Sequence, residues 1–199
     1  MKLLMAAPDR DLLMTYKKLF ELDSYEVTTA FDGTQVVNKL SENTADFVIL
    51  DRTLPRVDHS VVMKLIHEKK LPVIVLLRRK VTPQILLSSE TACSYMNFPF
   101  FPGELREKVA EVREMAECNE MLSAGGLDIT VKDFACKEGV RFTCEEINVL
   151  KALTKNESFD VRPISSYINS LNNKFERLKK SARIKYIMNE GYRLVNEYE

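Results

Sequence analysis

The chain has 199 residues, of which 45% are hydrophobic and 29% are charged. That length predicts one large domain or two small ones, with enough apolar side chains for sizeable cores. Because 29 Lys and Arg residues balance 29 Asp and Glu residues, the bulk charge indicates no polyanionic partner.

Cysteine usage and hydropathy narrow the class of protein further. The four cysteines, Cys93, Cys118, Cys136 and Cys144, form no Cys-x-x-Cys pair, so neither a zinc site nor a disulfide framework is indicated. The N-terminal segment turns charged too soon for a signal peptide, and no apolar run approaches the ~20 residues of a membrane span. We therefore expect reduced thiols, a cytoplasmic location and no membrane partner.

The first part of the chain alternates short apolar runs with helical patterns. Apolar runs without alternation fit buried parallel strands, which we expect at 3–7, 24–30, 47–50, 73–77 and 94–96. Helical patterns follow them at 10–22, 34–42, 59–69, 83–91 and 103–121. This alternation predicts an α/β fold with a doubly wound, five-stranded parallel sheet. Ligands of such sheets bind at the carboxyl ends of the central strands, where Asp9 and Asp51 fall.

The second part of the chain has a different pattern. Short strands are expected at 127–131, 134–137 and 140–144, then helices at 144–154 and 163–180, and a hairpin over 183–195. Thr143 and Glu146 have the spacing of a capping box at the start of the first helix. The pattern predicts a small α+β domain. We set the boundaries at 1–117 for the first domain, 118–126 for a linker containing the Ser-Ala-Gly-Gly break, and 127–199 for the second domain.

These segments resemble an OmpR/PhoB-type response regulator, in which a flavodoxin-like receiver domain precedes a winged-helix DNA-binding domain. The receiver resemblance runs through 47-FVILDRTLP-55, 72-PVIVL-76 and 95-YMNFPF-100. The winged-helix resemblance runs through 143-TCEEINVLKAL-153 and 191-GYRLV-195. Together the two resemblances span nearly the whole chain.

The resemblance makes Asp51 the phosphoacceptor-equivalent residue, but the receiver is degenerate. Such receivers hold Mg²⁺ with an acidic pair, because a hard cation takes oxygen ligands, and here that pair is Ala7 and Pro8. Leu77 stands where the switch hydroxyl is expected, and Phe98 where the lysine is expected. We therefore expect Asp51 to be an inactive, solvated carboxylate at a strand end. The alternative is a conventional regulator, phosphorylated at Asp51 with help from Asp9.

The resemblance also predicts a homodimer. The family's dimer face uses the fourth helix, fifth strand and fifth helix, which match residues 83–115 here. Charges of both signs alternate there and suit a symmetric, salt-bridged interface. They are Arg106, Glu107, Lys108, Glu111 and Arg113. The alternative is a solvated helix face.

The segment that resembles a recognition helix and wing is basic. Between residues 160 and 193, basic residues outnumber acidic ones by 8 to 3, which suits phosphate contact. Polar side chains opposite the apolar stripe, with their basic neighbours, are the predicted DNA contacts. They are Ser166, Asn169, Ser170, Asn173, Lys174, Arg177, Lys180, Arg183 and Lys185. Two features depart from the family: Met188 replaces a wing arginine, and the connection over 154–162 is too short for the usual bracing helix.

The preferred hypothesis is a phosphorylation-independent transcription regulator that binds double-stranded DNA as a homodimer. Two alternatives are open: a protein-interaction scaffold that has lost DNA binding, and a conventional two-component regulator phosphorylated at Asp51. An enzyme is not expected, because the sequence shows no nucleophile–base pair, phosphate-cradling glycine loop or metal-ligand cluster. No catalytic residue, cofactor, metal or small-molecule substrate is predicted.

Overall fold

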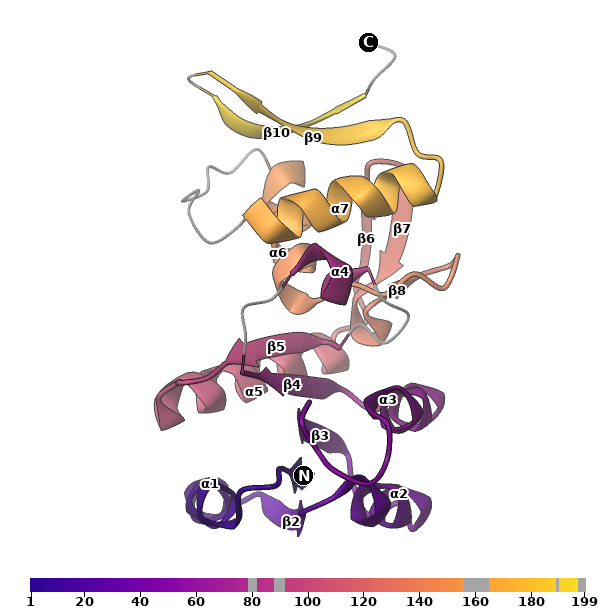
Figure 1. Cartoon of the computed structure of the whole chain (residues 1–199). Helices are drawn as coiled ribbons and strands as arrows, with labels where there is room; N and C mark the ends of the chain where they lie inside the picture. Colours follow the sequence, from indigo (N-terminus) through magenta and orange to yellow (C-terminus); the bar gives the residue numbers. More distant parts are fainter. Residues whose placement is uncertain (79–81, 88–91, 156–164, 189, 197–199) are drawn as a thin grey trace. The chain divides into compact units, whose positions relative to one another are not determined.

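The structure is a computed structural model that describes residues 1–78, 82–87, 92–155, 165–188 and 190–196. The chain forms two compact units (Figure 1). The first unit comprises Met1–Lys80 and Ala92–Arg113, and the second comprises Val81–Thr91 and Glu114–Glu199. A segment between two strands of the first unit therefore belongs to the second unit.

The first unit contains the predicted doubly wound sheet. Its parallel strands lie in the order β2-β1-β3-β4-β5. They are β1 (Lys2–Ala6), β2 (Glu26–Ala30), β3 (Phe47–Asp51), β4 (Val73–Leu77) and β5 (Ser94–Asn97). Every residue of β3 and β4 is buried, because helices cover both faces of a parallel sheet. The expected five-stranded α/β fold is confirmed.

Three helices of this unit start at aspartates that cap them. Asp9, Asp32 and Asp58 each accept a hydrogen bond from the backbone of the first turn that follows. These three helices are α1 (Arg10–Leu22), α2 (Gly33–Ser41) and α3 (His59–Glu68), and α5 (Pro102–Glu117) is a further helix of the unit. In Figure 1, α1 and α5 lie on one face of the sheet, while α2 and α3 lie on the other.

The helix expected at 83–91 is much shorter. Helix α4 spans Pro83–Leu86, a single turn, while residues 88–91 lie outside the described part of the chain. The helix packs on α7 (Ser165–Arg177) within the second unit, and Leu86 is fully buried there. Its burial thus comes from the second unit rather than from the sheet that precedes and follows it in sequence.

The second unit begins with strands, one of them in the expected linker. Strand β6 (Met121–Ala124) pairs with β7 (Leu127–Thr130), and β7 pairs with β8 (Ala135–Cys136). The linker expectation is wrong because the Gly125-Gly126 pair closes a hairpin turn. Both glycines have positive φ, and a Cβ at Gly125 would lie 2.7 Å from the Phe175 ring.

The rest of the unit follows the predicted order, and α7 ends three residues earlier than expected. Helix α6 (Cys144–Thr154) begins with the predicted capping box, in which Thr143 and Glu146 cap each other's backbone. Helix α7 follows, and β9 (Ala182–Ile187) and β10 (Gly191–Asn196) form the predicted hairpin. The strand expected at 140–144 is reduced to a single bridge between Arg141 and Ala135. The short connection lies mostly outside the described residues, from 156 to 164.

Within the described residues, no helix is both long enough and apolar enough to cross a membrane. The cysteines are free thiols, and only Cys118 is less than fully buried.

Candidate functional site

Asp51 ends β3 in the interior of the first unit. Its side chain has no exposed surface, so the expectation of a solvated carboxylate is wrong. One carboxylate oxygen, Oδ1, accepts hydrogen bonds from the Thr53 backbone N–H at 2.8 Å and the Thr53 hydroxyl at 2.7 Å. The other oxygen, Oδ2, is buried and accepts no hydrogen bond from the described residues, but lies 3.6 Å from a guanidinium nitrogen of Arg78. Among the described residues, the carboxylate is thus held by a local turn and by the Arg78 guanidinium.

Arg78 follows directly after β4 and connects Asp51 with the ring of Phe98. Its guanidinium carbon lies 5.1 Å from the centroid of the Phe98 ring, a cation–π arrangement. Phe98 stacks on Phe100 with ring centroids 4.6 Å apart. Leu77, the residue before Arg78, is buried. Arginine thus supplies the positive charge beside Asp51, where the family resemblance leads one to expect a metal ion and a lysine.

Sequence reasoning missed Arg78. The available signal was a pair of basic residues, Arg78 and Arg79, directly after the apolar run of the fourth strand. Strand ends in this fold converge on one edge of the sheet, so a cation there is placed to reach Asp51.

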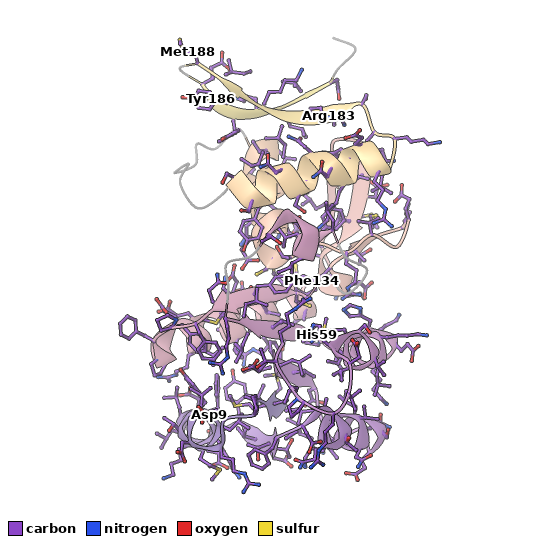
Figure 2. The ribbon with its side chains drawn as sticks, in the orientation of Figure 1. Asp9, His59, Phe134, Arg183, Tyr186 and Met188 are labelled. Carbon is purple, nitrogen blue, oxygen red and sulfur yellow. The ribbon has the colours of Figure 1, made fainter. Side chains whose placement is uncertain are left out.

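The other residues expected at this edge offer few oxygen ligands. Ala7 is buried, and neither Ala7 nor the exposed Pro8 has a side-chain oxygen. Asp9 lies at the start of α1 (Figure 2), where its carboxylate caps the helix by accepting the Leu12 N–H at 3.0 Å. Among the described residues, no group of three or more His, Cys, Asp or Glu side chains is arranged to hold a metal ion.

His59, the first residue of α3 (Figure 2), is a second unusual group, and the Asp51 charge acts on it. Burial and the positive charge of Arg52 lower its pKa from 6.5 to about 4, against the opposing effects of Asp58 and Asp51. The imidazole is therefore neutral at neutral pH. A residue interpreted from sequence as a plain loop position instead lies half-buried beside charged groups.

Helix α7 presents only part of the predicted DNA-contacting set. Asn169, Asn173 and Arg177 are exposed, and Ser166 is half-buried. Ser170 and Lys174 are buried, so their prediction as outward-facing contacts is wrong. Both lie close to the boundary of the apolar stripe, and a helical wheel does not reveal which side of that boundary α6 covers.

Lys174 is buried because it pairs with a buried partner. Its ammonium lies 2.6 Å from Oε2 of Glu146, and both side chains are almost inaccessible to solvent. Glu146 also accepts the Thr143 N–H as part of the capping box, so one carboxylate joins the start of α6 to the middle of α7. Burial lowers the pKa of Lys174, while the Glu146 carboxylate opposes that effect. The Phe142 ring lies 4.9 Å from the ammonium.

The hairpin has one basic face and one aromatic face. Lys185 and Arg193 are cross-strand partners and point to the same side, as does Arg183 two residues away on β9. Tyr186 and Tyr192 pair on the other side, with ring centroids 5.5 Å apart. Figure 2 shows Met188, Tyr186 and Arg183 in that order along the hairpin, with Met188 at the turn end.

Two predicted contacts in this region already have partners within the unit. Lys180 is half-buried and lies 3.2 Å from the Glu138 carboxylate. The Arg183 guanidinium donates to the backbone carbonyls of Lys180 and Ala182, at 3.2 and 2.9 Å. Lys185 is exposed. The exposed polar groups of the predicted set are therefore Asn169, Asn173, Arg177 and Lys185.

The charged residues predicted for a dimer face lie on α5, and several are paired within the first unit. Arg106 forms a two-point ion pair with Asp23, with Nε 2.6 Å from Oδ2. Lys108 pairs with Glu111 at 2.6 Å. Arg113 donates a long hydrogen bond of 3.4 Å to the Tyr25 hydroxyl, while Glu107 is exposed. Because α4 belongs to the second unit, only β5 and α5 of the expected face remain in the first.

Much of this chain is similar in sequence to known proteins. The family model described as the response regulator receiver domain matches residues 4–110. Response regulator GtcR of Aneurinibacillus migulanus is 32% identical over 123 residues, which cover 60% of this chain and 51% of that protein. The transcriptional regulatory protein KdpE of Staphylococcus aureus is 27% identical over 78% of this chain and 71% of its own. The chain thus spans about half the length of GtcR.

The first unit is also similar in fold to a solved receiver-domain structure. The receiver domain of the Francisella response regulator 1452 is 25% identical, with a TM-score of 0.52. The similarity covers 57% of this chain and 96% of that domain.

Proposed function

Since this chain belongs to the response regulator receiver family, we propose that it is a DNA-binding transcription regulator that works without phosphorylation of Asp51. The observation that carries the proposal is the Asp51 carboxylate itself. It is fully buried, held by Thr53 and placed beside the Arg78 guanidinium. A phosphoryl donor and its Mg²⁺ would have to displace that arrangement, and Ala7 and Pro8 offer the metal no side-chain oxygen.

The second unit supports the DNA-binding half of the proposal. A small antiparallel sheet, α6, α7 and a C-terminal hairpin follow one another in the order expected for a shortened winged-helix domain. Arg177 and the Asn169–Asn173 face of α7 offer the side-chain types that read guanine and adenine, and the basic hairpin face suits phosphates. The name of the relative KdpE describes that protein as a transcriptional regulator.

We propose further that the protein dimerises through α5 and β5 of the receiver. Exposed Glu107 and the surrounding Arg, Lys and Glu side chains offer both signs of charge on α5. A two-fold interface places each such charge opposite the same surface of the second copy, where unlike charges can pair.

Selection of bound sequences from a random duplex library tests this function. Purified protein that has met no phosphodonor should enrich a motif of two half-sites. Arg177→Ala should relax one position of each half-site and cost about 1–3 kcal/mol of binding free energy. Lys64→Ala, at an exposed position of α3, is the control and should leave the motif unchanged.

A parallel measurement tests independence from phosphorylation. Incubation with a small phosphodonor and Mg²⁺ should leave no acyl phosphate on Asp51 and no change in DNA affinity, and Asp51→Asn should bind DNA as the parent protein does. Phosphorylation of Asp51 that tightens DNA binding would identify a conventional two-component regulator instead. If no motif is enriched in either state, the protein does not read DNA and acts through protein partners.

A further inference from the structure

A small pocket in the second unit lies among basic side chains. It has a volume of about 130 Å³, enough for a few non-hydrogen atoms. Arg141, Lys174 and Arg177 line it together with one carboxylate, that of Glu138. Leu86 and Leu87, from the α4 segment, close an apolar side.

The charge around this pocket is unbalanced. Its lining has three basic side chains and one acidic side chain. Including the ion-pair partners, Glu146 for Lys174 and Lys180 for Glu138, adds one charge of each sign. The balance therefore stays at an excess of two positive charges, in a place partly shielded from solvent, where charges interact more strongly than in water.

One donor of a residue that lines the pocket lacks an acceptor among the described residues. The Nε–H of Arg141 is buried and makes no hydrogen bond among the described residues. Buried donors are usually satisfied, because an unpaired one costs free energy. Arg177 makes only a long hydrogen bond of 3.5 Å, to the Leu87 carbonyl. Both guanidinium groups thus have donor capacity for a further acceptor, and guanidinium groups favour oxyanions with two or more oxygens.

We propose that this pocket binds a small phosphate-type oxyanion, held by Arg141 and Arg177 with the positive charge of Lys174 behind it. The class includes free phosphate, sulfate and the phosphoryl end of a small phosphate monoester. An oxyanion would give the Arg141 and Arg177 guanidinium groups a further acceptor and would offset the excess positive charge of the lining. This site does not include Asp51 and does not depend on the protein's binding DNA.

The site would also connect the anion to two elements of the second unit. Arg177 lies on α7, and the Leu86-Leu87 wall comes from the α4 segment that packs on this helix. A bound anion would draw the Arg177 side chain toward the pocket. If α7 also contacts DNA, the same arginine has two competing acceptors, a base edge and the anion.

Isothermal titration of the full chain with inorganic phosphate at constant ionic strength tests the site, with no DNA present. Arg141→Met removes the unpaired donor and should weaken phosphate binding about tenfold or more. Lys137→Met is the matched control, because Lys137 is exposed in the same turn and does not line the pocket. It should leave the affinity unchanged, and Arg141→Lys should restore part of it.

Sulfate, acetate and phenyl phosphate titrations then define the ligand. Sulfate that binds like phosphate while acetate does not would support a tetrahedral oxyanion, and tighter binding of phenyl phosphate would favour a monoester. Circular dichroism and thermal unfolding of each variant confirm that it is folded. The proposal is overturned if phosphate produces no saturable heat, or if Arg141→Met and Lys137→Met weaken binding equally. Because DNA is absent, these outcomes are separate from failure of the proposed function.

Discussion

At the scale of single residues, the charges around Asp51 in the receiver unit differ from those that the family resemblance implies. Asp51 is enclosed, and its neighbours are a threonine turn, an arginine and an aromatic ring. An enclosed carboxylate needs a compensating cation, because desolvation of an isolated charge is costly. Arg78 is half-exposed, so water screens part of its attraction to Asp51. Among the described residues, its guanidinium forms the ion pair with the Asp51 carboxylate.

His59 should titrate far below an ordinary histidine. Its pKa of about 4 in the folded protein, against 6.5 when unfolded, means that only the unfolded chain takes up the proton between these pH values. The free energy of unfolding should therefore fall as pH drops from 6.5 to 4, by about 3 kcal/mol from this group. Imidazole chemical shifts measured against pH report the titration directly.

The variants separate His59 from other acid-sensitive groups. His59→Gln should lose its share of the pH dependence in urea unfolding, whereas His67→Gln, the other histidine, should keep it. A His59 imidazole that titrates near pH 6.5 would contradict the effect of burial and Arg52 on its pKa.

Breaking the Lys174–Glu146 pair should markedly lower the free energy of unfolding of the second unit. Lys174→Met leaves the Glu146 carboxylate buried without its cation, which should cost about 3–5 kcal/mol of unfolding free energy. Adding Glu146→Gln removes the stranded charge and keeps an acceptor for the Thr143 N–H, so the double variant should be more stable than Lys174→Met. Urea unfolding measures both, with Lys185→Met as the exposed control. Equal stability of Lys174→Met and the control would contradict this prediction.

At the scale of elements, the second unit is held together by contacts that cross between its helices and its hairpin. Asn172 on α7 both donates to the Ile184 carbonyl, at 3.0 Å, and accepts the Ile184 N–H, at 2.7 Å. This amide makes a two-point attachment of α7 to β9. The Asn172 amide therefore has a structural role.

Asn172→Ala should loosen that attachment. It leaves a backbone donor and acceptor on β9 without these partners, which should cost about 1–3 kcal/mol of unfolding free energy. Asn173→Ala, one residue further and exposed, should change stability by less than about 0.5 kcal/mol. Urea unfolding gives the energies, and faster hydrogen exchange at Ile184 in Asn172→Ala alone would locate the effect. No difference between the two variants would show that the hairpin is fastened elsewhere.

At the scale of the whole molecule, the two units are not continuous segments of the sequence. The segment around α4 lies between two receiver strands in the chain but belongs to the second unit, where Leu86 is buried and α4 packs on α7. The expected dimer face therefore lacks its fourth helix, and α5 is the part of it that carries exposed charge. A self-association that needs only α5 and β5 is the form of dimer consistent with this division.

Sedimentation of the purified chain tests the proposed dimer. Without any phosphodonor it should sediment as a dimer whose dissociation constant rises with salt, because salt screens exposed charge pairs. Glu107→Lys reverses an exposed charge on α5 and should weaken the dimer, whereas Glu68→Lys, the same change on α3, should not. A monomer at every concentration would contradict dimerisation, and equal effects of the two variants would place the interface elsewhere.

The sequence by itself determined the parallel sheet, the capped start of α6 and the hairpin, because each follows from local periodicity and short-range capping. Strand β3 with Asp51 at its end, the Thr143–Glu146 capping box and the β9–β10 pairing were all predicted from neighbouring residues. The family resemblance added the loss of side-chain oxygens at Ala7, Pro8 and Leu77 and of a lysine ammonium at Phe98.

Only the tertiary structure decided which side chains distant in sequence contact each other. Arg78 reaches Asp51 across adjacent strands, and Lys174 turns inward to a glutamate 28 residues earlier in the chain. The two glycines of the Ser-Ala-Gly-Gly break form a hairpin turn, because β6 pairs with β7. Charge pairing and burial depend on residues distant in sequence, and hydrophobic periodicity along one segment contains no information about which distant segment will cover it.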